Sequence, residues 1–327
     1  MARWDGMGRI GGYGAALAMT PYLVIKISWV VGALFGLLPT GGDATLAEWV
    51  VLNGATVVMA GVGIALALAL VRPWGMRIPG PPLALAAWVG AGFLVSVLPF
   101  AVVGSLLGSD DAEPDGAADG PAATDPGGDA GATLPAWEAG LIQAGFVGMG
   151  LGLALALPGY LRRRWPTAFA GRLGDGPGRS SVRWAIRSAI AAGAVPGAVW
   201  LYWAAGGTAG LAHPDRRDTA WYLLTALGAW WALAAVAAGW AVAAGRPAGT
   251  PRWVPLALGW LGSGSLFAWS GWKLPLTLYV ALARPDDTVP PEHPAVAVAL
   301  YGVAITAGAG LLRALVDAAR PRDRPPG

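Results

Sequence analysis

The stretch that decides the fold class runs from residue 46 to residue 71 and reads LAEWVVLNGATVVMAGVGIALALALV, with Glu48 as its one charged residue. A helix needs about 20 consecutive apolar residues to cross a bilayer, because the hydrocarbon core offers no partner to backbone polar groups. This stretch therefore predicts a transmembrane helix, and seven further stretches meet the same criterion. The eight predicted spans are 12–38, 46–71, 82–108, 136–161, 187–206, 219–244, 253–283 and 294–316.

The composition agrees with a membrane protein. Of the 327 residues, 55% are hydrophobic and 13% are charged, whereas an ordinary soluble domain carries about 25% charged residues. This excludes a single soluble domain and a long disordered chain. The chain has no cysteine, which excludes disulfides, iron–sulfur clusters, thiolate zinc sites and a cysteine nucleophile. The sequence predicts an all-α polytopic membrane protein that needs no cofactor.

The distribution of lysine and arginine predicts the orientation. The side that holds both termini carries 17 basic and four acidic residues, and the opposite side carries three basic and 15 acidic residues. Loops rich in lysine and arginine stay in the cytoplasm. We therefore expect a multi-pass protein of the cell (plasma) membrane with both termini cytoplasmic. The sequence pI of about 9.4 then reflects this sorting of charge, and we expect no nucleic-acid partner.

Two segments between spans have unusual charge. Segment 109–135 holds acidic residues without lysine or arginine, and its low hydrophobicity predicts a disordered outer loop. Calcium binding is the weaker alternative, because the segment has no Asp-x-Asp-x-Asp-Gly pattern. Segment 162–186 opens with three arginines and predicts a basic cytoplasmic linker that anchors the topology. The alternative is contact with anionic lipid headgroups, at about 1 kcal/mol per arginine.

The two halves of the chain carry matching segments. RPWG at 72–75 corresponds to RPAG at 246–249, and WVGAG at 88–92 corresponds to WLGSG at 260–264, with offsets of 174 and 172 residues. A nearly constant offset favours a duplication of one four-helix unit over chance similarity. Four spans per unit give both units the same orientation, with any symmetry axis along the membrane normal. The predicted domains are a first repeat at 1–161, the linker at 162–186, a second repeat at 187–318 and a cytoplasmic tail at 319–327.

The first span of the second repeat ends in the sequence VWLYWAAGG at residues 199–207. This resembles a family of small four-span bacterial membrane proteins of unknown function, whose first span ends in a Tyr-Trp-Ala-x-Gly-Gly pattern. The resemblance covers residues 187–318 and, more weakly, 12–161, where Ser28-Trp29-Val30-Val31-Gly32-Ala33 keeps only the tryptophan and one glycine. It implies a tandem four-span architecture and no particular chemistry.

Small residues predict where the helices pack. Gly148 and Gly152 form a Gly-x-x-x-Gly pattern in the fourth span, and Gly193 and Gly197 form another in the fifth. Glycines at this spacing let two helix backbones approach closely. We expect both faces to contact neighbouring helices.

The only two lysines, Lys26 and Lys273, both fall inside predicted spans. An ionised group at mid-bilayer costs about 2.5–3.5 kcal/mol on insertion scales, so such groups usually face a bundle interior or a wet cavity. Tyr22 and Trp29 near Lys26, and Trp272 near Lys273, can hold an ammonium by cation–π contact. These five residues form the predicted ligand-binding site, in one cavity shared by both lysines. The alternative for Lys273 is that its side chain reaches toward the interface.

Signs of catalysis and metal binding are weak. The sequence has no phosphate-binding loop, no nucleophile elbow and no His-Glu-x-x-His, so we expect no enzyme and no catalytic residues. The two histidines, His213 and His293, lie in outer loops beside Asp215 and Glu292. They are weak candidates for a metal site if the loops meet, and solvated loop residues are the favoured interpretation.

Three functions follow from these observations. The favoured one is a non-catalytic membrane scaffold or accessory subunit, because no catalytic constellation is present. The second is a transporter or binding protein for a small anionic or amphipathic molecule, using a cavity that contains Lys26 and Lys273. An intramembrane enzyme is the least favoured. The expected partners are the lipid bilayer and an unidentified protein.

Overall fold

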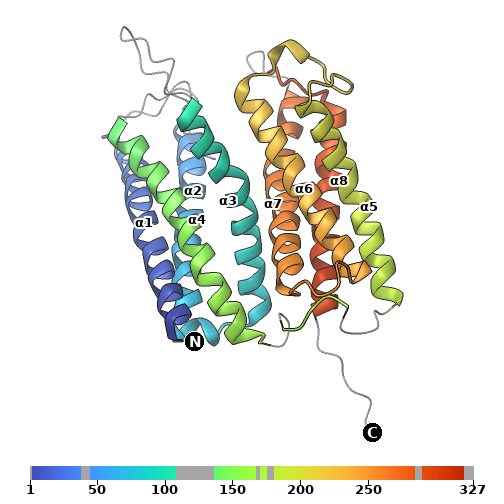
Figure 1. The fold of residues 1–327 in the computed structure, drawn as a ribbon. Helices are drawn as coiled ribbons and strands as arrows, with labels where there is room; N and C mark the ends of the chain where they lie inside the picture. The colour runs from blue at the N-terminus through green and yellow to red at the C-terminus, as the bar shows by residue number, and fades with distance from the viewer. Residues whose placement is uncertain are drawn as a thin grey trace. The chain divides into compact units, whose positions relative to one another are not determined.

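The structure is a computed structural model that describes residues 2–37, 45–107, 136–166, 170–174, 180–283 and 289–319. These residues form eight α-helices and two short 3-10 helices, η1 and η2, and contain no β-strand (Figure 1). The predicted all-helical fold is confirmed. The helices are α1 (Ala2–Leu34), α2 (Leu46–Val71), η1 (Pro73–Met76), α3 (Gly80–Leu107), α4 (Ala136–Arg164), α5 (Ser180–Ala204), η2 (Pro214–Arg216), α6 (Thr219–Ala244), α7 (Trp253–Ala283) and α8 (Pro294–Ala319).

The helices follow the predicted spans within four residues, except that α1 and α5 begin ten and seven residues earlier than predicted. Within the described residues, seven helices are long and apolar enough to cross a membrane, which indicates a multi-pass membrane protein. The eighth, α7, has 31 residues, but Lys273 and several serines lower its hydropathy. The predicted outer loop 109–135 lies outside the described residues, as do most of the tail and parts of the linker.

The chain divides into two compact units, which do not coincide with the two halves of the sequence. The first comprises residues 1–84 and 101–164, and the second comprises residues 85–100 and 165–327. The middle of α3 therefore belongs with α5–α8. The predicted repeats at 1–161 and 187–318 stay a prediction, since these units are defined by contacts.

In the first unit, α1 packs against α2 and α4. The glycine face predicted on α4 provides the contact with α1, because a Cβ atom added at Gly148 would lie 2.4 Å from the Cβ of Ala18. A Cβ atom added at Gly152 would lie 2.4 Å from the carbonyl oxygen of Gly11. Only glycine permits this approach, so the predicted contact face is confirmed.

Two of the linker arginines bind backbone carbonyls of the same unit. The guanidinium of Arg163 donates to the carbonyl of Leu70 at 2.8 Å, and that of Arg164 donates to the carbonyl of Met76 at 2.6 Å. The last carbonyls of a helix have no partner within the helix. These arginines therefore fix the C-terminal end of α4 to the end of α2 and to η1.

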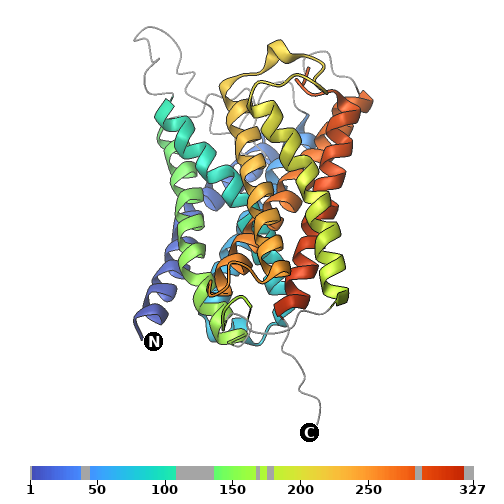
Figure 2. The ribbon, with the colours of Figure 1, turned by 45° about the vertical axis from the view of Figure 1, so that its right-hand side comes forward.

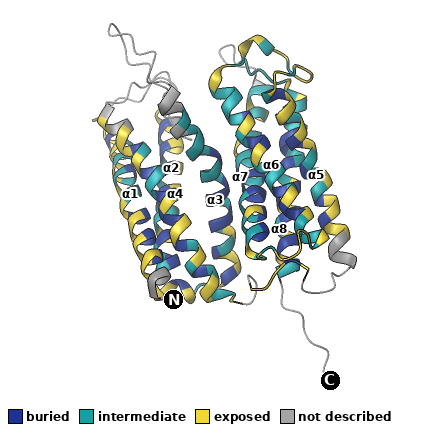
Figure 3. Ribbon diagram, in the orientation of Figure 1, coloured by how far each residue is buried: buried dark blue, intermediate teal, exposed yellow. Residues whose placement is uncertain are grey.

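In the second unit, α5 packs against α6 and α8, and α7 also packs against α6 and α8. Figure 2 shows α5 and α8 side by side, and Figure 3 shows the buried residues on the facing sides of the helices. Half of the twelve buried residues in its core cluster are alanines, including Ala229, Ala232, Ala235 and Ala304, each at most 1% exposed. The predicted face on α5 is confirmed, because a Cβ atom at Gly197 would lie 3.3 Å from that of Ala232.

The middle of α3 crosses α7 through two glycines. A Cβ atom added at Gly92 would lie 2.1 Å from the carbonyl carbon of Gly264, so the two backbones are in direct contact. On one side of the crossing, the indole of Trp88 donates to the hydroxyl of Ser263 at 3.1 Å. A second hydrogen bond joins the hydroxyls of Ser96 and Ser265 at 2.8 Å, and buried polar bonds of this kind hold membrane helices together.

Candidate functional site

Lys26 lies inside the first unit with no exposed surface. Its ammonium donates to the side-chain oxygen of Asn53 on α2 at 3.0 Å. The Nζ atom also lies 4.1 Å from the ring centroid of Trp29 and 5.8 Å from that of Tyr22. The amide of Asn53 in turn donates to the carbonyl of Trp49 at 3.0 Å. The ammonium thus contacts a neutral acceptor and two aromatic rings, and such contacts stabilise a positive charge that is buried away from water.

Asn53 was not among the site residues predicted from the sequence. It is the only asparagine of the chain. It is the eighth residue of α2, and Lys26 is the ninth residue counted back from the end of α1. In a hairpin of two helices these positions come to about the same depth. Their similar depth in two consecutive helices is the sequence feature from which the contact between Asn53 and Lys26 could have been predicted.

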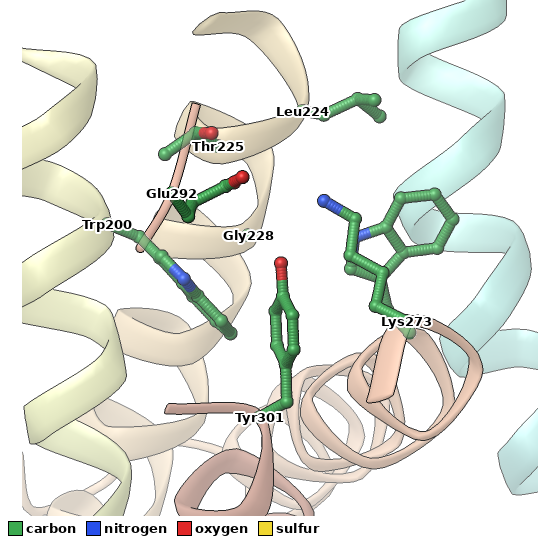
Figure 4. Close-up of a pocket in the computed structure, with 8 residues that line it drawn as sticks. Trp200, Leu224, Thr225, Gly228, Lys273, Glu292 and Tyr301 are labelled. Atoms are coloured by element: carbon green, nitrogen blue, oxygen red, sulfur yellow. The ribbon is translucent and has the colours of Figure 1, made fainter. Parts of the chain in front are cut away.

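Lys273 lies in the second unit, beside a small pocket (Figure 4). The pocket has an empty volume of about 280 Å³, part of it open to solvent, and its enclosed part is the size of about one water molecule. The polar ends of Lys273, Glu292 and Tyr301 point toward one another in Figure 4. The pocket is lined by Trp200, Leu224, Thr225, Gly228, Trp269, Lys273, Glu292 and Tyr301.

The ammonium of Lys273 lies beside two aromatic rings. Its Nζ atom lies 5.6 Å from the ring centroid of Trp269 and 5.7 Å from that of Tyr301. The hydroxyl of Tyr301 and the carboxylate of Glu292 face the ammonium of Lys273 across the pocket (Figure 4). Glu292, which the sequence predicts in an outer loop, therefore belongs to the surroundings of Lys273 on α7.

Glu292 reaches the pocket because its segment is fixed onto the loop that follows α5. Glu292 forms an isolated β-bridge with Leu211. The amides of Ala212 and His213 both donate to the carbonyl of Pro291, at 2.8 and 3.0 Å. The side chain is held as well, since the indole of Trp221 donates to its Oε1 atom at 2.8 Å.

The other predicted site residues are placed as follows. Trp272 is 38% exposed and does not line the pocket, and its ring meets that of Phe93 edge-on at 6.3 Å. The loops of His213 and His293 do meet through their backbones. Among the described residues, however, no group of three histidine, cysteine or acidic side chains is placed to hold a metal ion. The two lysines belong to different units, each with partners inside its own unit.

The Tyr-Trp-Ala-x-Gly-Gly segment forms the C-terminal cap of α5. The amide of Gly207 donates to the carbonyl of Tyr202, the amide of Gly206 donates to that of Trp203, and Gly206 has a φ of +97°. This is the hydrogen-bond pattern of a Schellman cap. A Cβ atom at Gly207 would lie 2.3 Å from the ring of Tyr202, and the indole of Trp203 donates to the carbonyl of Ala209 at 2.8 Å. Every prominent residue of the segment thus ends the helix or fixes the loop that follows.

No protein-family model, no curated protein and no solved structure matches the chain. The resemblance to small four-span bacterial proteins therefore stays a prediction.

Proposed function

We propose that the chain is a non-catalytic scaffold or accessory subunit of a bacterial plasma membrane. The supporting observation is that buried polar side chains in both units bond to one another, as in Lys26 with Asn53 and Ser96 with Ser265. Such bonds join helices and leave those groups occupied. A transporter or an enzyme needs interior polar groups that a substrate can reach, and the enclosed part of the pocket beside Lys273 has room for about one water molecule.

The proposal includes eight spans, with α7 among them. The polar residues that lower the hydropathy of α7 include Ser263, Ser265 and Ser270, each at most 3% exposed. Because α7 packs between the apolar helices α6 and α8, it meets protein on the faces where its polar residues lie. Polar groups that face protein are tolerated at membrane depth. An even number of spans then gives the two termini the same side.

The topology has a direct test. The charge distribution places a tag after Gly327 in the cytoplasm and a tag inserted near Gly120 outside. We expect protease added to intact cells to cut within 109–135 and to spare 162–186. A cytoplasmic marker protein that stays uncut is the control for intact cells. Tags on the reverse sides would contradict the orientation, and exposure of both tags on one side would contradict the even number of spans.

A partner surface is best placed on α6 around Trp230. This side chain is 67% exposed and lies near the middle of α6, whereas tryptophan prefers the membrane–water interfaces. A photo-crosslinking amino acid at position 230 should give one protein adduct in native membranes, confirmed by reciprocal tagging of the partner. The matched control is position 58, where Val58 is 65% exposed on α2. Lipid adducts alone at both positions would overturn the scaffold proposal.

We also propose that the two halves arose by duplication. Gly92 and Gly264, which correspond at the offset of 172 residues, are in backbone contact. An approximate two-fold axis along the membrane normal brings equivalent positions together at one crossing. The contact between Gly92 and Gly264 supports the duplication. The resemblance to a family of four-span proteins agrees with a duplicated four-helix unit.

A second candidate function is the binding or transport of a small polar or amphipathic molecule. It is favoured by one observation, the convergence of Lys273, Glu292 and Tyr301 on the pocket of the second unit (Figure 4). Lys26 contributes to this function only if it reaches the same cavity. Binding of anionic lipid headgroups by the linker is less favoured than its role as a topology anchor, because Arg163 and Arg164 already donate to backbone carbonyls.

A further inference from the structure

We propose that the pocket beside Lys273 recognises a small zwitterion, with a carboxylate and an ammonium group a few bonds apart, as in the smallest amino acids. This inference rests on the second candidate function and names its ligand class. It is carried by the charges that line the pocket and by the fixed position of Glu292.

The charge balance of the lining selects the ligand. The pocket holds one cationic side chain, Lys273, and one anionic side chain, Glu292. A simple anion would lie against the carboxylate of Glu292, and a simple cation would lie against the ammonium of Lys273. Bringing an unbalanced charge into a low-dielectric site is costly. A zwitterion places each of its charges beside the opposite charge and leaves the site neutral.

The hydrogen-bonding groups give each end of the ligand its partners. The ammonium of Lys273 and the hydroxyl of Tyr301 point into the same pocket and can both donate to a carboxylate (Figure 4). Glu292 accepts from an ammonium, and the hydroxyl of Thr225 lines the same space. These polar groups come from α6, α7, α8 and the segment before α8, so the site depends on the fold of the whole second unit.

Glu292 is positioned before any ligand arrives. The indole of Trp221 holds its Oε1 atom at 2.8 Å, and the β-bridge to Leu211 fixes its backbone. A carboxylate held in this way loses little side-chain freedom on binding, which lowers the cost of association. The arrangement resembles a preformed acceptor more than a mobile surface acid.

The walls limit the ligand to a small size. Trp200 is 7% exposed and Tyr301 is 5% exposed, so both rings are packed against the bundle. Gly228 lines the pocket opposite Trp200, and a Cβ atom there would lie 3.3 Å from the indole ring. The enclosed part holds only about one water molecule, so we expect glycine to bind where the pocket opens to solvent, with its charges beside Lys273 and Glu292, and we expect an aromatic amino acid to be excluded.

The test uses the full chain in lipid nanodiscs, with binding followed by calorimetry. Four probes are compared: glycine, acetate, methylammonium and phenylalanine. We expect saturable binding of glycine, with acetate, methylammonium and phenylalanine each at least tenfold weaker. This comparison uses the unaltered chain, so it does not depend on the folding of any variant.

Variants then assign the two ends of the site. Lys273→Met and Glu292→Gln should each weaken glycine binding at least tenfold. The matched control is Arg313→Gln, an exposed charge change on α8, and it should leave binding unchanged.

Equal binding of acetate and glycine, with no loss in Glu292→Gln, would overturn the zwitterion inference while the second candidate function stands. Absence of binding by all four probes to the folded chain would overturn both.

Discussion

Replacing Gly92 by alanine should separate α3 from α7 and destabilise the protein. The added Cβ atom would lie 2.1 Å from the carbonyl carbon of Gly264 and 2.3 Å from its carbonyl oxygen. Ordinary contacts between such atoms are at 3.4 Å or more, so the two backbones must move apart by more than 1 Å. Both neighbours at the clash are backbone atoms, which cannot rotate away as a flexible side chain can.

The expected cost combines overpacking with lost hydrogen bonds. Extra methyl groups in a packed interior cost about 1–3 kcal/mol. Separation of the helices also stretches the bonds from Trp88 to Ser263 and from Ser96 to Ser265, each worth about 0.6 kcal/mol in a membrane protein. We therefore expect Gly92→Ala to lower the free energy of unfolding by about 2–4 kcal/mol.

The measurement is equilibrium unfolding in mixed micelles, followed by the fluorescence of the tryptophans. Gly90→Ala is the matched control, because it adds the same methyl group two residues away on α3, where no heavy atom lies within 4 Å. The control should be unchanged or slightly more stable, since glycine within a helix costs about 0.5–1 kcal/mol relative to alanine. Equal stability of the two variants would refute the contact between Gly92 and Gly264.

Three further substitutions test other contacts. Asn53→Leu removes the acceptor of the buried Lys26 ammonium and should lower the free energy of unfolding by about 3 kcal/mol. The double variant with Lys26→Met should recover most of that loss. If unfolding measurements give the single and double variants the same loss, the hydrogen bond contributes little to stability. Gly152→Ala should lower the free energy of unfolding by about 1–3 kcal/mol. The control is a variant with alanine in place of an exposed glycine of α4, and equal stability of the two variants would contradict the close approach of α1 and α4. Trp221→Phe should cost about 1.5 kcal/mol through the lost hydrogen bond to Glu292, and it should weaken glycine binding in the nanodisc assay; unchanged binding would remove Trp221 from the positioning of the carboxylate.

The helices could be predicted from the sequence because length and hydropathy act locally. Each long apolar run produced one helix, and the glycine faces on α4 and α5 contact their neighbours as the spacing required. The grouping of the helices could not be predicted in the same way. Residues 85–100 pack with the second unit through tertiary contacts such as that of Gly92 with Gly264. The residue pattern along one helix does not indicate which other helix it will contact.

The candidate site was predicted only in part. Lys26 and Lys273 stood out because ionised residues inside spans are costly, but their partners did not. Asn53 is neutral, so a search for carboxylates inside the spans passed over it. Glu292 precedes α8 in the sequence and joins the pocket through the β-bridge to Leu211, a contact between two loops 81 residues apart. Loop contacts of that range have no periodicity to reveal them.

The crossing of Gly92 and Gly264 also constrains the order of events during synthesis. The two glycines are separated by 172 residues, and ribosomes add about 5–20 residues per second. About 10–30 s therefore pass between the synthesis of the middle of α3 and the synthesis of the part of α7 that covers Gly92 and Ser96. During that interval the polar and small residues of α3 lack their contacts with α7. A chaperone-like component of the membrane that shields α3 would shorten the time in which this helix can pair with the wrong neighbour.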